Sequence, residues 1–265
     1  MLFRSAAPSY GLRGWASRLK EAVSFEGENP PAILSLAKGL ESDSLKLPRE
    51  VLQEILPAAP VYALSGPNFA REVARGCPAA AVLAGQAYTP QLERLQQVMS
   101  SHLLRIYTSD DSIGVELGGC LKNVYAIGAG ICQGLKLGDN ARAALLTRSL
   151  NEMLQLIPHL QGRVETVYGL SGIGDLVATC YGELSRNRDF GQQIGEGWDI
   201  QEILGERPTT VEGYFACANF HQLFKSHEIQ GPILEQLYGV LYHGIHPREA
   251  LAALMSRNLK PEKLS

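Results

Sequence analysis

Short apolar runs alternate with helical patterns through the first part of the chain. The runs are rich in Ala, Val, Ile and Leu and read "PAILSLAKG", "VYALSGP", "AAAVLAG" and "LLRIYTS". Between them, "REVLQEIL", "NFAREVARG" and "PQLERLQQVMSS" repeat apolar residues at helical spacing. This alternation predicts strand-helix units on a mostly parallel sheet that can include an antiparallel member.

The pattern changes near residue 112, after which strand signals nearly vanish. Helical periodicity then predicts helices over residues 114–133, 140–157, 187–196, 211–226, 230–242 and 246–256. No internal repeat or long linker separates the two parts. We therefore predict an α/β domain over residues 1–112 and an all-α domain over residues 113–265.

The segment "GVELGGCLKNVYAIGAG", residues 114–130, carries a lysine in the middle of a glycine-rich helical pattern. On a helical period one face is an ordinary core stripe, made of Ile113, Leu117, Leu121, Val124 and Ile131. The opposite face holds Lys122 among small residues, namely Gly118, Gly119, Ala126, Ala129 and Gly130. Glycine inside a helix costs about 1 kcal/mol relative to alanine. We interpret the bare face as one that a ligand approaches closely.

Composition narrows the classes of protein that fit. The chain has 265 residues, 45% hydrophobic content and a formal charge of -3 with scattered basic residues, which does not indicate a nucleic-acid partner. Its longest apolar runs are far shorter than the roughly 20 residues of a membrane span. The five cysteines form no C-x-x-C pair and favour a reduced, cytoplasmic setting. The histidine pairs lack accompanying acids or cysteines, so we expect no metal site.

The first twenty residues allow two interpretations. They contain four basic residues and no acid before Glu21, which is typical of an organelle transit peptide. Alternatively, residues 6–20 already belong to the folded domain, with a turn at Pro8-Ser9 and a helix whose buried face is Leu12, Trp15, Ala16 and Leu19. We favour the folded interpretation.

Two predicted strand ends carry polar residues where α/β proteins bind ligands. Lys38-Gly39 follows the first of these strands, and Ser65-Gly66-Pro67-Asn68 follows the next. Pro67 suits a first helical turn whose amides face an anion. The alternative for Lys38 is an ordinary surface lysine in a turn.

Three later positions can also carry chemistry. Asp175 lies in a glycine-rich turn, where a helix N-cap is the simplest role. Ser185, Arg186 and Asn187 offer a hydroxyl, a guanidinium fork and an amide that suit a phosphate monoester, or simply begin an N-capped helix. Glu212 lies near another helix start, where an acid complements the helix dipole. Together with the two lysines, these residues favour a small phosphorylated substrate and proton transfer by lysine over hydrolysis.

Several segments together resemble a known family. The chain looks like the bacterial-type NAD(P)-dependent glycerol-3-phosphate dehydrogenases in six segments. Five of them are short: "AKGLE", "LSGPNFAREVARG", "GLSGIGDLVATC", "LSRNRDFG" and "VEGY". The sixth is the long stretch from "YTSDDSIGVELGGCLKNVYAIGAG" to "RAALLTRSLNEM". The resemblance runs in order from about Ala6 to the C-terminus. It implies an incomplete Rossmann-type domain followed by an α-helical substrate domain.

The family's activity and functional positions follow from this resemblance. Lys122 would accept the C2 hydroxyl proton of glycerol 3-phosphate, or return it when dihydroxyacetone phosphate is reduced, while the nicotinamide of NAD or NADP carries the hydride. The substrate-contacting positions are Lys38, Gly66, Asn68, Lys122, Asp175, Ser185, Arg186 and Asn187. The cofactor-contacting positions are Lys38, Ala70, Arg186, Thr210 and Glu212. Asn68 stands where the family usually has Ser or Thr and can still hydrogen-bond. The product would feed glycerophospholipid synthesis.

One family feature is absent from the sequence. Family members carry a G-x-G-x-x-G-type turn in a first strand-turn-helix unit, and this chain has no such motif. A fragment or misassigned start would explain this, and so would a genuine short form; we favour the first. For the 265-residue chain we expect weak or no nucleotide binding.

Other interpretations remain open at the level of sequence. A related dehydrogenase of an unphosphorylated hydroxy acid would have little use for the "LSRNRDFG" cluster. A non-catalytic helical assembly module, left after loss of the nucleotide domain, would bind neither nucleotide nor substrate. The choice between NAD and NADP is not readable, and neither is the oligomeric state, although a homodimer is consistent with the sequence.

Overall fold

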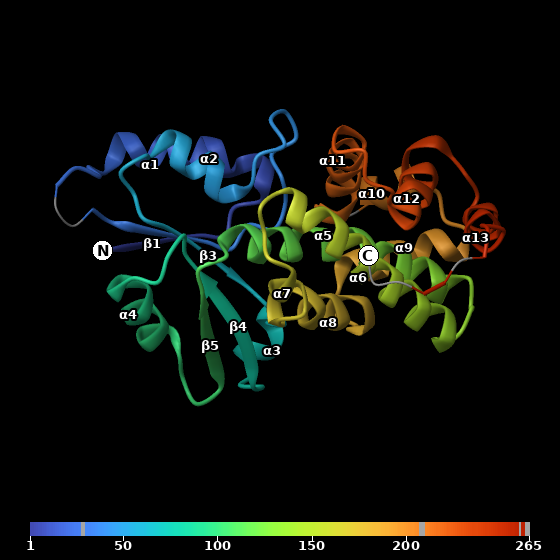
Figure 1. The fold of residues 1–265 in the computed structure, drawn as a ribbon, viewed down its shortest axis with the longest axis horizontal. Helices are drawn as coiled ribbons and strands as arrows, with labels where there is room; N and C mark the ends of the chain where they lie inside the picture. Colours follow the sequence, from blue (N-terminus) through green and yellow to red (C-terminus); the bar gives the residue numbers. More distant parts are fainter. Residues whose placement is uncertain (28–29, 207–209, 260, 263–265) are drawn as a thin grey trace. The chain divides into compact units, whose positions relative to one another are not determined.

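The computed structural model describes residues 1–27, 30–206, 210–259 and 261–262 (Figure 1). The chain forms two compact units, the first comprising Met1–Gly119 with Gln161–Asp175 and the second Cys120–Leu160 with Leu176–Ser265. The predicted division after residue 112 stays a prediction. Along the chain, the division between the units falls within the helix Ser112–Gly134, and the first unit also includes the later segment Gln161–Asp175.

A five-stranded sheet forms the centre of the first unit (Figure 1). Its strands are β1 (Leu2–Ser5), β2 (Ala32–Ser35), β3 (Val61–Ser65), β4 (Ala79–Ala84) and β5 (Leu104–Ser109), in the order β1-β2-β3-β4-β5. All neighbouring pairs are parallel except β3 and β4, which are antiparallel. The predicted mostly parallel sheet with an antiparallel member is confirmed, while β1 was not predicted.

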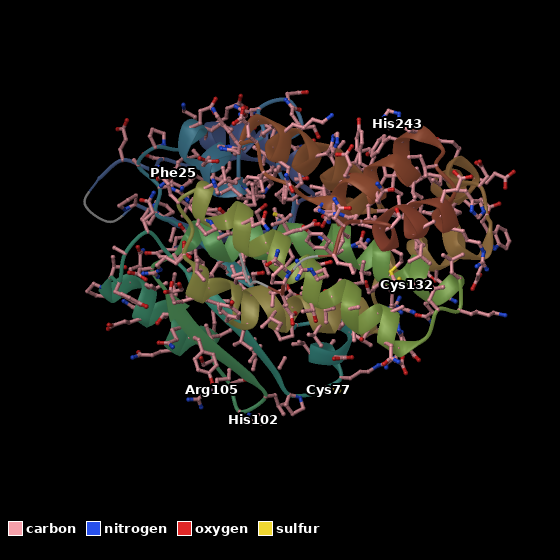
Figure 2. The ribbon with its side chains drawn as sticks, turned by 45° about the vertical axis from the view of Figure 1, so that its right-hand side comes forward. Phe25, Cys77, His102, Arg105, Cys132 and His243 are labelled. Carbon is pink, nitrogen blue, oxygen red and sulfur yellow. The ribbon has the colours of Figure 1, made fainter. Side chains whose placement is uncertain are left out.

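Helices cover both faces of this sheet, as a parallel sheet requires. Helices α1 (Leu12–Ala22) and α2 (Pro48–Ile55) lie on one face, and α4 (Pro90–Met99) lies on the other (Figure 1). Strand alternation divides the core between them: Ile33 packs with Leu12 and Leu52, whereas Leu34 packs with Leu92. Phe25, labelled in Figure 2, joins the first cluster from the segment after α1.

Residues near the chain start are folded into the first unit. Leu12 and Ala16 of α1 are buried, and Trp15 and Leu19 pack against the same cluster. The short 3-10 turn Ser9–Gly11 precedes this helix. These are the contacts that the folded interpretation of residues 6–20 predicted.

The remaining elements are helical. Helix α5 (Ser112–Gly134) spans both units, and α7 (Val164–Val167) with the π-helical turn Leu170–Gly174 belongs to the first. The second unit contains α6 (Asp139–His159), α8 (Asp175–Tyr181, apart from its first residue), α9 (Arg186–Glu196), α10 (Ile200–Glu206), α11 (Glu212–Ser226), α12 (Pro232–His243) and α13 (Pro247–Met255). All six helices predicted beyond residue 112 are present, and α7, α8 and α10 are additional.

Helix α5 is buried on both faces, which corrects the interpretation of its glycine strip. A Cβ atom at Gly118 would lie 2.6 Å from the Ser171 carbonyl oxygen, and one at Gly119 would lie 2.5 Å from Ser65 Oγ. In the second unit, a Cβ atom at Gly130 would lie 1.9 Å from the Arg188 carbonyl oxygen. The bare face is therefore covered by the protein's own backbone and side chains at these positions. Close packing, rather than the approach of a ligand, requires these glycines.

A buried carboxyl group on α5 caps a neighbouring helix of the first unit. Glu116 is 4% exposed, and its Oε1 atom accepts a hydrogen bond of 3.0 Å from the Arg49 amide in the first turn of α2. Among the described residues, the other carboxyl oxygen of Glu116 has no hydrogen-bond partner. Burial raises the pKa of Glu116 to about 8.

We expect Glu116 to make stability fall as pH rises. The ordinary pKa is 4.5 and the folded-state pKa is about 8, so the folded protein binds the extra proton between these values. The free energy of unfolding therefore decreases through this window. At pH 9, Glu116→Gln should be more stable than the parent by a few kcal/mol, at roughly 1.4 kcal/mol per pKa unit, and the difference should shrink toward pH 5.

Urea denaturation of both proteins at the two pH values measures this effect. The exposed residue Glu21 provides a matched control, because Glu21→Gln should leave the pH dependence unchanged. An identical pH dependence in Glu116→Gln and the parent would show that the buried carboxyl group does not titrate in this window.

Candidate functional site

An ion pair in the first unit joins two of the predicted site residues. Lys38 follows β2, and its Nζ atom lies 2.7 Å from Asp175 Oδ2. The side chain of Lys38 is 19% exposed and that of Asp175 is 3% exposed. Ser65 Oγ, at the end of β3, donates a longer hydrogen bond of 3.5 Å to the same carboxylate oxygen. A lysine and a buried carboxylate thus meet beside the carboxyl ends of two parallel strands, and Lys38 is not an ordinary surface lysine.

The position of Asp175 corrects its proposed role as a helix N-cap. Its backbone is helical, with φ -72° and ψ -31°, and it directly follows the π-helical turn Leu170–Gly174. An N-cap residue has non-helical backbone angles. The carboxylate instead reaches across the unit to Lys38, which is 137 residues away in the sequence.

The segment after β3 is less regular than the sequence suggested. Gly66 has φ +146°, and a Cβ atom there would lie 2.8 Å from Ala81 Cα, so only glycine fits. Helix α3 (Ala70–Ala74) begins at Ala70, three residues after Pro67, so the predicted helical turn at Pro67 is wrong. Asn68 is half-buried in the connecting segment, and Ala70 is exposed.

A hydrogen-bonded network in the second unit surrounds the residue next to Lys122. Lys122 is 6% exposed on α5, and the neighbouring Asn123 Oδ1 accepts a hydrogen bond of 2.9 Å from Asn187 Nδ2. Asn187 Oδ1 in turn accepts one of 3.0 Å from the Gly213 amide. Asn187 therefore joins α5, α9 and α11, and its amide orientation is fixed from both sides.

The first turn of α9 has a capped helix start and two arginines with different surroundings. Ser185 is the N-cap, because its Oγ accepts a hydrogen bond of 3.2 Å from the Arg188 amide. Arg186 is exposed, whereas Arg188 is buried and donates from Nε to the Gly182 carbonyl oxygen at 3.1 Å. Arg188 thus stabilises the turn that precedes α9. Arg186 is the arginine of this cluster whose guanidinium group is accessible from outside.

The start of α11 holds the last two predicted positions. Glu212 is the first residue of the helix, where its charge complements the helix dipole, and Thr210 lies two residues earlier. Both side chains are half-buried. Because Gly213 bonds to Asn187, the start of α11 is tied to the start of α9.

The structure brings the predicted residues together in two sets. Lys38, Asp175 and the segment at Gly66 meet in the first unit, and the Asn187 network joins the surroundings of Lys122, Arg186 and Glu212 in the second. The sequence placed Ser65 at a strand end without indicating its partner Asp175, and it did not indicate Asn123 as the partner of Asn187. Each had a usable signal: Ser65 is a polar residue that ends a buried strand, and Asn123 is an amide within an apolar helix.

Among the described residues, no group of three or more His, Cys, Asp or Glu side chains is arranged to hold a metal ion. No helix in the described part of the chain is both long enough and apolar enough to cross a membrane.

Comparison with known proteins identifies related chains. Residues 3–90 match the family model of the NAD-dependent glycerol-3-phosphate dehydrogenase N-terminus, and residues 111–252 match that of its C-terminus. A glycerol-3-phosphate dehydrogenase (NAD(P)+) of Acaryochloris marina is 46% identical over 87% of this chain and 74% of its own length. Its counterpart in Trichormus variabilis is 43% identical over 97% of this chain and 83% of its own length.

A solved structure agrees with these matches. The crystal structure of glycerol-3-phosphate dehydrogenase from Coxiella burnetii is 38% identical, with a TM-score of 0.88 over 97% of this chain and 76% of that one. The match to residues 3–90 shows that the N-terminal domain is present, and it does not confirm the expected lack of that domain's glycine-rich part. The two family models and these relatives together show that the chain belongs to the NAD-dependent glycerol-3-phosphate dehydrogenase family.

Proposed function

We propose that this protein interconverts sn-glycerol 3-phosphate and dihydroxyacetone phosphate with NAD(P)(H) as the redox partner. The observation that carries the proposal is the pairing of Lys38 with Asp175, because two residues assigned to substrate binding from distant motifs meet at 2.7 Å. A buried carboxylate that holds a lysine amine fixes its direction. Lys38 can then donate hydrogen bonds to a substrate oxygen with little further loss of side-chain conformational entropy.

The proton-transfer role belongs to Lys122 in this proposal. Lysine is rarely buried without a specific reason, and Lys122 is 6% exposed on α5. Its amine would take the proton of the C2 hydroxyl group when glycerol 3-phosphate is oxidised and return it to that oxygen in the reverse direction. The Asn123–Asn187 hydrogen bond holds the neighbouring part of α5 against α9.

The remaining substrate positions suit a phosphorylated three-carbon compound. Arg186 and Asn187, at the capped start of α9, would bind the phosphate group through a guanidinium fork and an amide. We assign Gly66, Asn68 and Ser185 to substrate contact as well. Ala70, Thr210 and Glu212, with Lys38 and Arg186, are assigned to cofactor contact.

The described residues do not fit the whole nucleotide. Dinucleotides bind where the strand order of a parallel sheet reverses and where a glycine-rich turn receives the pyrophosphate. The described sheet has the unreversed order β1-β2-β3-β4-β5, and the sequence contains no G-x-G-x-x-G motif. We therefore propose that residues 1–265 do not supply the glycine-rich turn that receives the pyrophosphate.

This proposal predicts weak nucleotide binding. Isothermal titration calorimetry of the 265-residue protein with NADH and NADPH should detect no complex with a dissociation constant in or below the micromolar range, because the pyrophosphate lacks its backbone amide donors. A nanomolar-to-micromolar dissociation constant for either nucleotide would contradict it.

Substrate recognition can be tested separately from nucleotide binding. In thermal-shift measurements, sn-glycerol 3-phosphate and dihydroxyacetone phosphate should stabilise the protein, whereas glycerol and an unphosphorylated hydroxy acid should not. Stabilisation by the hydroxy acid would favour a related dehydrogenase. A folded protein that responds to none of these ligands or nucleotides would favour a non-catalytic helical assembly module.

We further propose a cytoplasmic location, a homodimeric state and supply of glycerol 3-phosphate to phospholipid synthesis. The odd number of cysteines without a C-x-x-C pair supports the location. The relatives named above support the metabolic role through the reaction in their names.

A further inference from the structure

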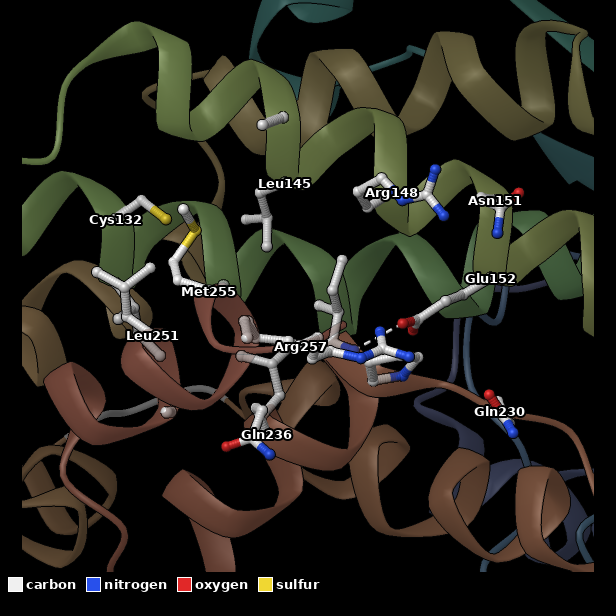
Figure 3. Close-up of a pocket in the computed structure, with 18 of the residues that line it drawn as sticks. Cys132, Leu145, Arg148, Asn151, Glu152, Gln230, Gln236, Leu251, Met255 and Arg257 are labelled. Atoms are coloured by element: carbon white, nitrogen blue, oxygen red, sulfur yellow. Dashed lines mark hydrogen bonds between the residues drawn. The ribbon is translucent and has the colours of Figure 1, made fainter. Parts of the chain in front are cut away.

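A cavity in the second unit lies apart from the proposed catalytic residues of that unit. Helices α5, α6, α12 and α13 line it, and its volume is about 750 Å³ (Figure 3). This volume falls within the range of about 300–1,000 Å³ that is usual for small-molecule sites. Among the described residues, neither Lys122 nor Asn187 nor Glu212 belongs to its lining.

One end of the cavity is apolar. Cys132 of α5, Leu145 of α6, and Leu251 and Met255 of α13 lie near one another at this end in Figure 3. Met255 is 78% exposed, although it borders a hollow lined by other apolar side chains. Methionine is unbranched and adapts to the shape of what it contacts. A ligand with an unbranched apolar chain would remove these side chains from water.

The other end of the cavity is polar, but its buried carboxyl group is already engaged. Glu152 Oε1 accepts a hydrogen bond of 2.6 Å from the Ile233 amide, and Oε2 accepts bonds of 3.2 Å from the Leu234 amide and 3.1 Å from the Tyr125 hydroxyl. Glu152 therefore caps the start of α12 across the unit. Its oxygens are satisfied by the protein and do not recruit a cationic ligand.

Among the described residues, two arginines and two glutamates line the cavity, and only one of the glutamates, Glu152, has its carboxylate oxygens bound by the protein's own donors. Arg148 of α6 is half-buried, and Arg257, after α13, is exposed and close enough to Glu152 to act on it electrostatically. Glu228 is the other acidic residue of the lining and is exposed. Guanidinium groups pair with carboxylate and phosphate through two parallel hydrogen bonds, which ammonium groups do not provide.

We propose that this cavity binds a small amphipathic anion. Its unbranched apolar body lies between α5, α6 and α13, and its carboxylate or phosphate head contacts Arg148 and Arg257. The apolar end and the two arginines are complementary to the two ends of such a molecule.

Calorimetry with matched twelve-carbon probes tests the head group. Dodecanoate and dodecyl phosphate, each below its micelle-forming concentration, should bind the 265-residue protein, and the tighter of the two identifies the preferred head. Dodecan-1-ol and dodecyltrimethylammonium should bind at least about tenfold more weakly, since a charge-assisted hydrogen bond gives a difference of this size. Equal binding of the alcohol and the anions would overturn the proposal, as would no binding of either anion.

A matched pair of variants tests the location. Ala143 and Ala144 are both exposed on α6, but only Ala144 belongs to the lining of the cavity. Ala144→Trp should lower the affinity for the anionic probe by about tenfold or more by filling the cavity, and Ala143→Trp should leave it unchanged. Arg148→Gln should weaken anion binding without affecting the alcohol, while Arg248→Gln, outside the lining, should change neither.

The same variants show whether the cavity is occupied by a second copy of the chain and not by an anionic ligand. Sedimentation of the parent and of Ala144→Trp should give the same oligomeric state. If Ala144→Trp dissociates an oligomer and the anionic probes do not bind the parent, the cavity belongs to an interface between copies and the proposal is wrong. If Ala144→Trp does not fold, unchanged anion binding in Arg148→Gln would overturn the proposal by itself.

Discussion

Replacing Lys122 by methionine is expected to lower the rate of dihydroxyacetone phosphate reduction by about 10²–10⁴-fold, the usual contribution of a positioned acid or base. Methionine keeps an unbranched side chain in this buried position and removes the amine that would carry the proton. Because we propose that residues 1–265 bind nucleotide weakly, the rates of parent and variant are both measured with a glycine-rich strand-turn-helix segment fused ahead of residue 1. Initial rates are compared at saturating NADH.

The control is the exposed lysine of α11, because Lys225→Met removes one positive charge without touching the proposed site. Its rate should match that of the parent. The Lys122→Met protein should keep its far-ultraviolet circular dichroism spectrum. Retained activity in this folded variant would remove Lys122 from the proton-transfer role. If the variant does not fold, Lys122→Arg supplies the same test with the charge kept, and parent-like activity there would count against a specific role for the lysine amine.

Substituting alanine for Gly130 is expected to prevent stable folding of the second unit. The new Cβ atom would lie 1.9 Å from the Arg188 carbonyl oxygen and 2.7 Å from the Gln192 amide nitrogen, both backbone atoms of α9. Backbone cannot move aside as a flexible side chain can, so α5 and α9 must separate. A separation of packed helices costs several kcal/mol, which is a large part of the roughly 5–15 kcal/mol that stabilises a domain.

Thermal unfolding followed by circular dichroism measures this effect. Gly205→Ala, within α10, is the matched control, because a Cβ atom there has no neighbour within 4 Å. Alanine has the higher helix propensity, so this control should be stabilised by about 0.5–1 kcal/mol. An unfolding midpoint for Gly130→Ala within a few degrees of the parent would show that the two helices do not need this close approach.

Most elements of the fold could be predicted from local pattern, and the exceptions have physical causes. Strands β2 to β5 and the long helices produce clear periodicity because each has a buried face or is buried throughout. Strand β1 has four residues, of which only Ser5 is buried, so it lacks the continuous apolar pattern that reveals the equally short but fully buried β2. Helix α3 begins later than Pro67 suggested, because the turn at Gly66 is fixed by its close approach to Ala81 on the neighbouring strand.

The residues of the candidate site could be predicted from the sequence, but their contacts could not. Residue type and motif alone indicate Lys38, Asp175, Ser185 and Asn187 as site residues. Their partners could not be predicted, because the partner of Lys38 lies 137 residues away and that of Asn187 lies on another helix. The glycine-rich surroundings of Asp175 favour a helix cap, and only the distant lysine explains where its carboxylate lies.

The sequence by itself determined that α5 has a core stripe and an opposite face on which Lys122 lies among small residues, since the helical period places each residue around the axis. Only the tertiary structure decided what covers that face. The carbonyl oxygens of Ser171 and Arg188 lie too close to Gly118 and Gly130 for any side chain to fit. A period describes one helix alone, whereas the segments that pack against it come from elsewhere in the chain. For the same reason, the sequence placed a lysine and an aspartate in separate motifs, and the fold joined Lys38 to Asp175.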